Sequence, residues 1–208
     1  MRDACQENET DMTNQKGRLL AIDTGSTSTK IGYFVDGELA FEENLAHKAE
    51  DLAGFKDVME QDTLRRDDVR IFMRGKGIHA QDIDIVMARG GLFYPVVTGI
   101  YSVNEDMREV LRICKYGRHA CNLSAIIADD LAKEITEKNV ARGVEMPFGV
   151  CRAYIADPPM ADEMLPECRV GGLPEFQRRP FFHALNSRAV VRRYLKDHGY
   201  IQNDITAI

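Results

Sequence analysis

Alternating apolar and polar positions begin at Arg18. The run RLLAIDTGS predicts a short strand that enters a turn, and STKIGYFVDGELAFEENLAH predicts two more strands joined at Asp36 and Gly37. Strands that follow one another before any crossover helix form a meander. This order differs from a doubly wound fold, which alternates strands and helices from its first strand.

Helical spacing replaces the alternation after the third strand. Two groups of apolar residues at i, i+3 and i+4 predict two consecutive helices that stop near Gly75 and Gly77. The groups are Phe55, Val58 and Met59, and then Val69, Phe72 and Met73.

Strands and helices alternate through the rest of the chain. The run IDIVMARGG predicts a strand buried over residues 83–87 that ends in a glycine turn, and VCRAYIADPP predicts another strand. Asn104 is placed to cap one helix, an apolar stripe from Leu123 to Ile135 predicts a longer one, and FHALNSRAVVRRYLKDHG predicts a helix closed by Gly199. A three-stranded meander followed by alternating helices and strands predicts an α/β domain with the ribonuclease-H-like fold.

The two ends of the sequence differ from its middle. Residues 1–17 are polar and lack periodicity, so we expect a disordered leader, and we expect the folded domain to span 18–199. The final DITAI begins like another strand and stops. We therefore expect residues 200–208 to start a further, truncated domain.

Composition limits the kinds of partner. Apolar residues are 44% of the chain, charged residues are 29%, and the net charge is -6 without a long basic run, so we expect no nucleic-acid partner. The apolar runs fall short of the roughly 20 residues of a membrane span, and we expect a cytoplasmic protein. The five cysteines include no CxxC pair, which predicts reduced thiols.

The turn after the first strand is the sharpest candidate for chemistry. Asp23 leaves the strand beside a glycine that lets the backbone approach a ligand closely, and its carboxylate could hold Mg²⁺ through the metal's water shell. The candidate phosphate-binding residues are Gly25, Ser26, Thr27, Ser28 and Lys30. The spacing is not that of a Walker loop. An ordinary polar hairpin turn is the alternative.

The segment DTGSTSTK resembles the first phosphate motif of the superfamily of acetate and sugar kinases, heat-shock proteins and actin. Four further segments resemble butyrate kinases and occur in the same order: ARGGLFYPVVTGIYSVNEDM, GRHACNLSAIIADDLAKEI, IADPPMADEM and GGLPEFQRRPFFHALNSRAVVRRY. The resemblance runs from Leu19 to about His198. It implies the ribonuclease-H-like (actin-like ATPase) fold and reversible transfer of the γ-phosphoryl of ATP to a short-chain carboxylate such as butyrate, giving an acyl phosphate and ADP with Mg²⁺.

The resemblance also assigns candidate catalytic residues. Arg89, at a strand end beside two glycines, would hold the carboxylate or the phosphoryl oxygens, unless it is an exposed structural arginine. His119 and His183 stand at helix starts and would face the phosphoryl group, although either could cap its own helix. Asn122 would help to position the phosphoryl group. Asp157 corresponds to an active-site aspartate that orients an arginine, and a turn-forming role is its alternative.

Two departures from the butyrate and acetate kinase pattern concern these residues. Asp23 stands where those kinases usually have asparagine, and Arg89 adjoins the glycine pair, whereas acetate kinases carry their arginine a few residues earlier. The resemblance places the adenosine pocket, a second phosphate motif, a second arginine and a metal-ordering glutamate in a C-terminal domain. We therefore expect this chain to be inactive alone and to associate with such a domain or with a second copy of itself.

Two other readings stay open. Activators of 2-hydroxyacyl-CoA dehydratases share an IDxGSTSTK start but carry cysteines for an iron–sulfur cluster, and the scattered cysteines and the RGG and FHALN segments favour the kinase over them. A non-catalytic interaction domain that dimerises is the other alternative.

Overall fold

A single mixed sheet organises the protein, described by a computed structural model over residues 17–173 and 175–200. The expected leader and the expected start of a further domain fall almost wholly outside these residues. The sheet has six strands in the order β3-β2-β1-β4-β6-β5. In chain order they are β1 (Arg18–Thr24), β2 (Ser28–Val35), β3 (Glu38–Ala46), β4 (Ile85–Ala88), β5 (Ile100–Ser102) and β6 (Arg152–Ala156).

The helices fill the connections between strands. They are α1 (Ala49–Leu52), α2 (Asp62–Gly75), α3 (Glu105–Arg112), α4 (Cys121–Ala141) and α5 (Ala184–His198), with 3-10 turns at Val58–Gln61, Ala80–Asp82 and Pro166–Arg169. No helix among the described residues combines the length and apolarity that crossing a membrane requires.

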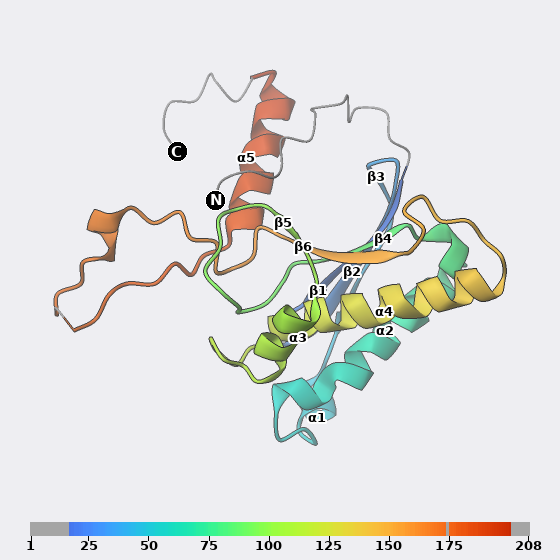
Figure 1. Ribbon diagram of the computed structural model, residues 1–208, viewed down its shortest axis with the longest axis horizontal. Coiled ribbons are helices and arrows are strands. Elements are labelled where there is room, and N and C mark those ends of the chain that lie inside the picture. Colours follow the sequence, from blue (N-terminus) through green and yellow to red (C-terminus); the bar gives the residue numbers. More distant parts are fainter. Residues whose placement is uncertain (1–16, 174, 201–208) are drawn as a thin grey trace.

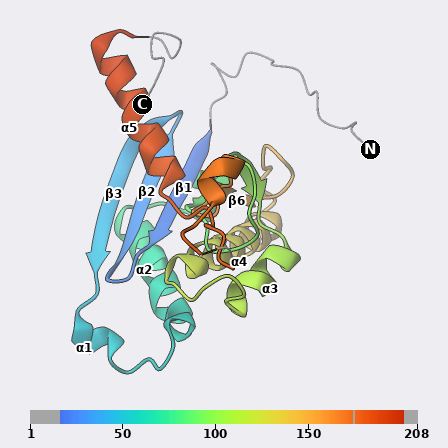
Figure 2. The same cartoon turned by 90° about the vertical axis from the view of Figure 1, so that its left-hand side faces the viewer.

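The predicted meander is confirmed. Strands β1, β2 and β3 pair antiparallel, and they lie side by side in Figure 2. Asp36 and Gly37 form the predicted turn between β2 and β3, with φ angles of 53° and 84°. Two consecutive residues with positive φ give the hairpin turn whose twist matches that of the flanking strands.

The crossovers that follow are parallel. Strand β4 pairs with β1, and β6 pairs with β4, so the carboxyl ends of three neighbouring strands meet at one edge of the sheet. Figure 1 shows α2 and α4 on one side of the sheet and α5 on the other. Together with the meander, this arrangement is the predicted ribonuclease-H-like fold.

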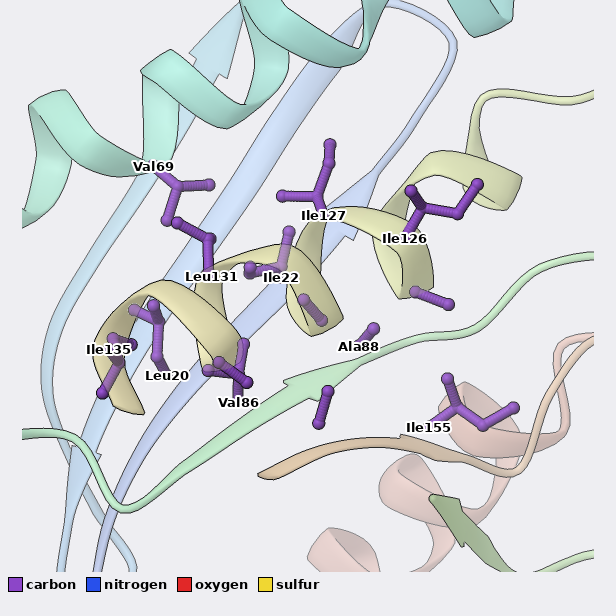
Figure 3. Packing of buried hydrophobic residues seen from close by; sticks show 14 of the residues in the cluster. Leu20, Ile22, Val69, Val86, Ala88, Ile126, Ile127, Leu131, Ile135 and Ile155 are labelled. Atoms are coloured by element: carbon purple, nitrogen blue, oxygen red, sulfur yellow. The ribbon is translucent and has the colours of Figure 1, made fainter. Parts of the chain in front are cut away.

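Helix α4 covers the core. Its apolar stripe packs on side chains of β1, β4 and β6, while α2 contributes Val69 at one side (Figure 3). The side chains at the centre of this core are Leu20, Ile22, Val86, Ala88, Ile155, Ile126, Ile127, Leu131 and Ile135. Because side chains alternate along a strand, Asp23 and Lys30 point to the opposite face from Ile22 and Ile31, toward α5.

The predicted helix ends are also confirmed. The Asn104 side chain accepts a hydrogen bond from the backbone N–H of Met107 at 2.8 Å, which caps α3. Gly199 ends α5 in the left-handed conformation, with φ of 70°.

The prediction of two consecutive helices before Gly75 is wrong for the first of them. Phe55 lies in a loop, and the segment after it forms only the 3-10 turn, which Asp57 caps by accepting from the N–H of Met59 at 3.0 Å. Met59 still packs against the core. Apolar spacing at i, i+3 and i+4 therefore reflects partial burial of a loop and a 3-10 turn rather than an α-helix. Strand β5 was not predicted either, because its three residues carry no apolar alternation.

Candidate functional site

Hydrogen bonds within the turn and to the start of α4 hold the hydroxyl-rich turn between β1 and β2. The N–H of Gly25 donates to the carbonyl of Ser28 at 2.8 Å, which closes the turn, and Ser26 and Thr27 are exposed at its tip. Thr24 is fully buried, and its hydroxyl donates to the carbonyl of Ala120 at 2.7 Å. This bond ties the carboxyl end of β1 to the start of α4.

Arg89 follows β4 directly and lies next to Asp23. Its backbone N–H donates to the carbonyl of Ile22 at 3.1 Å, so the parallel pairing continues one residue beyond the strand. The guanidinium Nη1 lies 3.4 Å from both carboxylate oxygens of Asp23, and the two side chains are 26% and 31% exposed. The Arg89 side chain is therefore held by the Asp23 carboxylate and remains accessible to solvent.

His183 completes this group from α5, which it precedes. Its Nδ1 contacts Nη2 of Arg89. A guanidinium only donates hydrogen bonds, so Nδ1 accepts and the neutral imidazole carries its proton on Nε2. The Nε2–H is therefore the group that His183 has left to offer to a ligand.

These side chains line one cavity of about 450 Å³. Its walls carry two cationic side chains, one carboxylate and one imidazole, a set that suits an anionic ligand. The lining residues are Asp23, Lys30, Arg89, His183, Leu185, Asn186 and Ala189. Lys30 makes no ion pair within the described part of the chain, which leaves its charge for a ligand.

The two glycines after Arg89 permit close packing behind the cavity. Gly90 has φ of 88°, and a Cβ there would lie 3.3 Å from Ile155 and 3.4 Å from Pro158. At Gly91, a Cβ would lie 2.7 Å from the Cα of Asn122. The glycine pair therefore brings the Arg89 turn against both the end of β6 and the start of α4.

His119 stands two residues before α4. Its Nδ1 accepts from the N–H of Cys121 at 3.1 Å, so this imidazole also keeps its proton on Nε2 when neutral. Its ring is exposed and lies outside the residues that line the cavity. The contact is a capping contact, and it also leaves Nε2 free to donate.

Asn122 is fully buried, and its amide is used within the chain. The Oδ1 accepts from the N–H of Leu92 at 2.8 Å, and Nδ2 donates to the carbonyl of Gly117 at 2.9 Å. The structure does not bring this amide to the cavity. Its contacts fix the chain that leaves the glycine pair, and a direct contact with a phosphoryl group stays a prediction.

Asp157 follows β6 and has φ of 38°. One carboxylate oxygen accepts from the N–H of Gly99 at 2.8 Å, and the other lies 3.6 Å from Nη1 of Arg188. The same arginine donates to Thr98 at 2.7 Å and to Glu163 at 2.8 Å. Asp157 does pair with an arginine, and that arginine is on α5, five residues after His183.

Sequence reasoning missed Arg188 and Asn186, which α5 brings to this region. It also missed two buried residues beneath the turn, Arg65 and its partner Gln61. No local signal distinguishes any of them, because a charged or polar residue on an amphipathic helix is usually on its solvent face.

His47, directly after β3, is nearly buried. Its side chain is only 6% exposed, and its Nε2 lies 2.9 Å from the hydroxyl of Thr29 and 3.2 Å from the carboxylate of Asp68. Burial lowers the pKa of His47, while the charge of Asp68 opposes this. The imidazole therefore packs against β2 through Thr29 and is largely shielded from solvent.

Asp23 is the candidate for holding Mg²⁺ among the residues that the structure describes. Within the described residues no three side chains of His, Cys, Asp or Glu gather in a way that could hold a metal ion. Mg²⁺ commonly keeps several waters and binds through one or two carboxylates together with substrate phosphates. A single, partly exposed carboxylate next to a phosphate-binding turn fits that mode, and it does not fit a metal held by protein alone.

Known sequences similar to this chain include butyrate kinases. Butyrate kinase 1 of Clostridium acetobutylicum is 39% identical over 191 residues, which are 92% of this chain and 50% of that protein. Butyrate kinase 2 of the same organism is 39% identical over 193 residues, and a probable butyrate kinase of Phocaeicola vulgatus is 39% identical over 191. No family profile matches the chain.

Solved structures give the fold. The acetate kinase of Porphyromonas gingivalis superposes with a TM-score of 0.52 and 13% identity over 89% of this chain and 50% of that one. A propionate kinase of Francisella tularensis gives 0.52 and 10% identity over 88% and 50%. The chain is therefore a homologue of the butyrate kinases with the fold of the acetate and propionate kinases, and it spans about half the length of these relatives.

Proposed function

We propose that this chain supplies the phosphoryl- and carboxylate-binding half of a butyrate-kinase-like phosphotransferase. The reaction moves the γ-phosphoryl of ATP to a short-chain carboxylate, reversibly, and gives an acyl phosphate and ADP. The observation that carries the proposal is the cavity in which Lys30, Arg89 and His183 converge beside Asp23, which lies two residues before the hydroxyl-rich turn. The homology to butyrate kinases supports the substrate class.

The reaction mainly requires that the charges of the two anions be compensated and that the attacking oxygen be aligned with the γ-phosphorus. A carboxylate oxygen attacks the γ-phosphorus while the bond to the bridging oxygen of ADP breaks, and ADP leaves with that electron pair. Two anions meet in this step, so cationic donors around the transferring group lower the barrier. A carboxylate is already ionised at neutral pH and needs no general base.

Arg89 is the residue best suited to this task. Its guanidinium offers planar, paired donors that match the oxygens of a carboxylate or a phosphoryl group. Asp23 and His183 hold it from two sides, at 3.4 Å for the carboxylate, so its fork is oriented before a ligand arrives. His183 and His119 each keep an Nε2–H that could donate to the transferring phosphoryl.

The turn 25–28 would hold the phosphate chain through its hydroxyls and outward backbone N–H groups. Asp23 would order the water shell of Mg²⁺, which when bound neutralises charge on the phosphates. Asp157 and Arg188 would fix α5, and through it His183, against the end of β6. The adenosine pocket and the remaining cationic groups would come from a second domain, as the resemblance to these kinases implies.

A complementation assay tests the proposal. The pure chain is mixed with the half of Clostridium acetobutylicum butyrate kinase 1 that has no counterpart in it, together with ATP, Mg²⁺ and butyrate. Butyryl phosphate is trapped as its hydroxamate. We expect product from the mixture and none from either half alone. No product from any mixture in which the two halves associate would contradict the proposal, and robust product from the chain alone would contradict the need for a second half.

A further inference from the structure

A buried arginine lies directly beneath the candidate phosphate turn. Arg65 of α2 is 0% exposed. Its Nη1 donates to the carbonyl of Ser28 at 3.0 Å and to the hydroxyl of Thr29 at 3.3 Å, and its Nη2 reaches the carbonyl of Ser26 at 3.5 Å. Gln61 Oε1 accepts from Nε and Nη2 at 3.1 and 2.9 Å. Every one of these acceptors is neutral.

The positive charge of Arg65 has no direct counter-ion within the described residues. The carboxylate of Asp68, one turn further along α2, contacts Nε2 of His47 at 3.2 Å and forms no ion pair with Arg65. Burial lowers the pKa of Arg65 and the charge of Asp68 opposes this, but a guanidinium stays protonated in proteins. Burying a charge is unfavourable unless it is paired. The fold therefore retains a cation that its own side chains compensate only at a distance.

The contacts of Arg65 also orient the turn. The carbonyls of Ser26 and Ser28 face inward to the guanidinium. On the outer side, Ser26 and Thr27 are exposed, and neither backbone N–H donates a hydrogen bond to any part of the chain that the structure describes. With its carbonyls turned inward, the turn leaves the N–H groups of Ser26 and Thr27 available to an anion, as in the backbone sites that bind phosphate.

We propose that Arg65 is a positioning residue whose buried charge is balanced by the anion that the turn 25–28 binds. The inference rests on the proposed function, in which that anion is a phosphate group of the nucleotide, and it assigns part of the turn's affinity to a residue that never touches the ligand. The attraction acts through the protein, where it is screened less than in water.

The substitution Gln61→Glu separates this role from a purely structural one. The new carboxylate keeps both hydrogen bonds from Arg65 and supplies the missing counter-charge without moving the guanidinium. A structural arginine gains from this exchange or is unaffected by it, and anion binding by the turn would not change. A counter-charge role predicts that stability holds or rises while anion affinity falls.

Inorganic pyrophosphate is the probe, titrated calorimetrically into the full chain. We expect Gln61→Glu to raise the dissociation constant at least about tenfold, equivalent to about 1.4 kcal/mol, with a urea midpoint no lower than that of the wild type. Thr63→Glu is the matched control, since it adds the same charge at an exposed position of α2 and should bind as the wild type does. Arg65→Gln removes the charge by a second route and should weaken binding at least as much.

Equal affinity of the wild type, Gln61→Glu and Arg65→Gln would overturn the role of Arg65 and leave the phosphate turn intact. A wild-type chain that binds no pyrophosphate would overturn the phosphate site and this inference together. If both variants bind pyrophosphate more weakly but the complemented wild-type chain forms no acyl phosphate, the role of Arg65 is supported and only the proposed function is refuted.

Discussion

Replacing Gly91 with alanine tests the packing that places Arg89. The added Cβ would lie 2.6 Å from Cδ2 of Leu111, 2.7 Å from the Cα of Asn122 and 2.9 Å from its Oδ1. Leu111 could rotate away, but the Cα belongs to helix α4 and the Oδ1 is held by a hydrogen bond from Leu92. The clash therefore has to be relieved by moving backbone.

Overpacking of a core costs about 1–3 kcal/mol, and a clash with backbone belongs at the upper end of that range. We expect Gly91→Ala to lower the free energy of unfolding by about 3 kcal/mol. For a chain of this size the melting temperature should fall by roughly 6–12 °C. Urea denaturation followed by circular dichroism at 222 nm measures the loss directly.

Gly75→Ala is the matched control. Gly75 ends α2, and a Cβ there meets nothing within 4 Å. Alanine should leave stability unchanged or raise it by up to about 1 kcal/mol, because it reduces the freedom of the unfolded chain. A Gly91→Ala variant within about 0.5 kcal/mol of the wild type would refute the close approach of the glycine pair to α4.

Three smaller effects follow from single contacts. Cys168 is exposed and should react quickly with a maleimide at pH 7.5, whereas Cys121 should be protected, because burial raises its pKa to about 11. Peptide mass spectrometry measures the labelling of both cysteines, and equal labelling would contradict the burial of Cys121. Asn104→Ala removes the cap of α3 and should cost about 1 kcal/mol in urea denaturation, and no loss would mean that the cap is not formed in solution. Burial raises the pKa of Asp84, but hydrogen bonds from Arg18 outweigh this effect, so the pKa is lowered overall. The stabilisation from the Asp84–Arg18 pair is therefore present above about pH 4 and is lost as the pH falls through the pKa of the folded state. Asp84→Asn should therefore show a weaker loss of stability than the wild type between pH 5 and pH 2, and an unchanged slope would exclude the pair as its source.

The sequence predicted those parts of the fold that depend on local patterns. The turn at Asp36 and Gly37 needs only residues that tolerate positive φ, and the stripe of α4 needs only helical spacing, so both were recognisable. Asn104 and Gly199 act on their own helices. Strand β5 forms because it pairs with β6, and the sequence of its three residues, Ile100–Ser102, does not indicate that pairing.

The candidate site divides in the same way. Asp23 and Arg89 could be expected near each other, because Asp23 is at the carboxyl end of one buried strand, Arg89 follows another, and parallel strands end at one edge of a sheet. The contact between Arg89 and His183 joins residues 94 positions apart and depends on where α5 lies, which no local pattern specifies. The burial of Arg65 could not be predicted, because its neutral partners lie in the turn and one helical turn back.

Arg89 tests the central claim most directly. In the complemented mixture of halves, the wild-type chain is compared with Arg89→Ala, Arg89→Lys and the control Arg74→Ala, an exposed arginine on α2 remote from the cavity. Turnover and the Michaelis constant for butyrate are measured separately, since loss of a contact made only in the transition state lowers turnover.

We predict that Arg89→Ala lowers turnover at least about 100-fold, equivalent to roughly 2.7 kcal/mol of transition-state stabilisation. Lysine should recover only part of that, since it keeps the charge and loses the paired donors, and Arg74→Ala should match the wild type. An Arg89→Ala chain with wild-type turnover and an unchanged Michaelis constant would contradict the assignment of this cavity as the site of phosphoryl transfer.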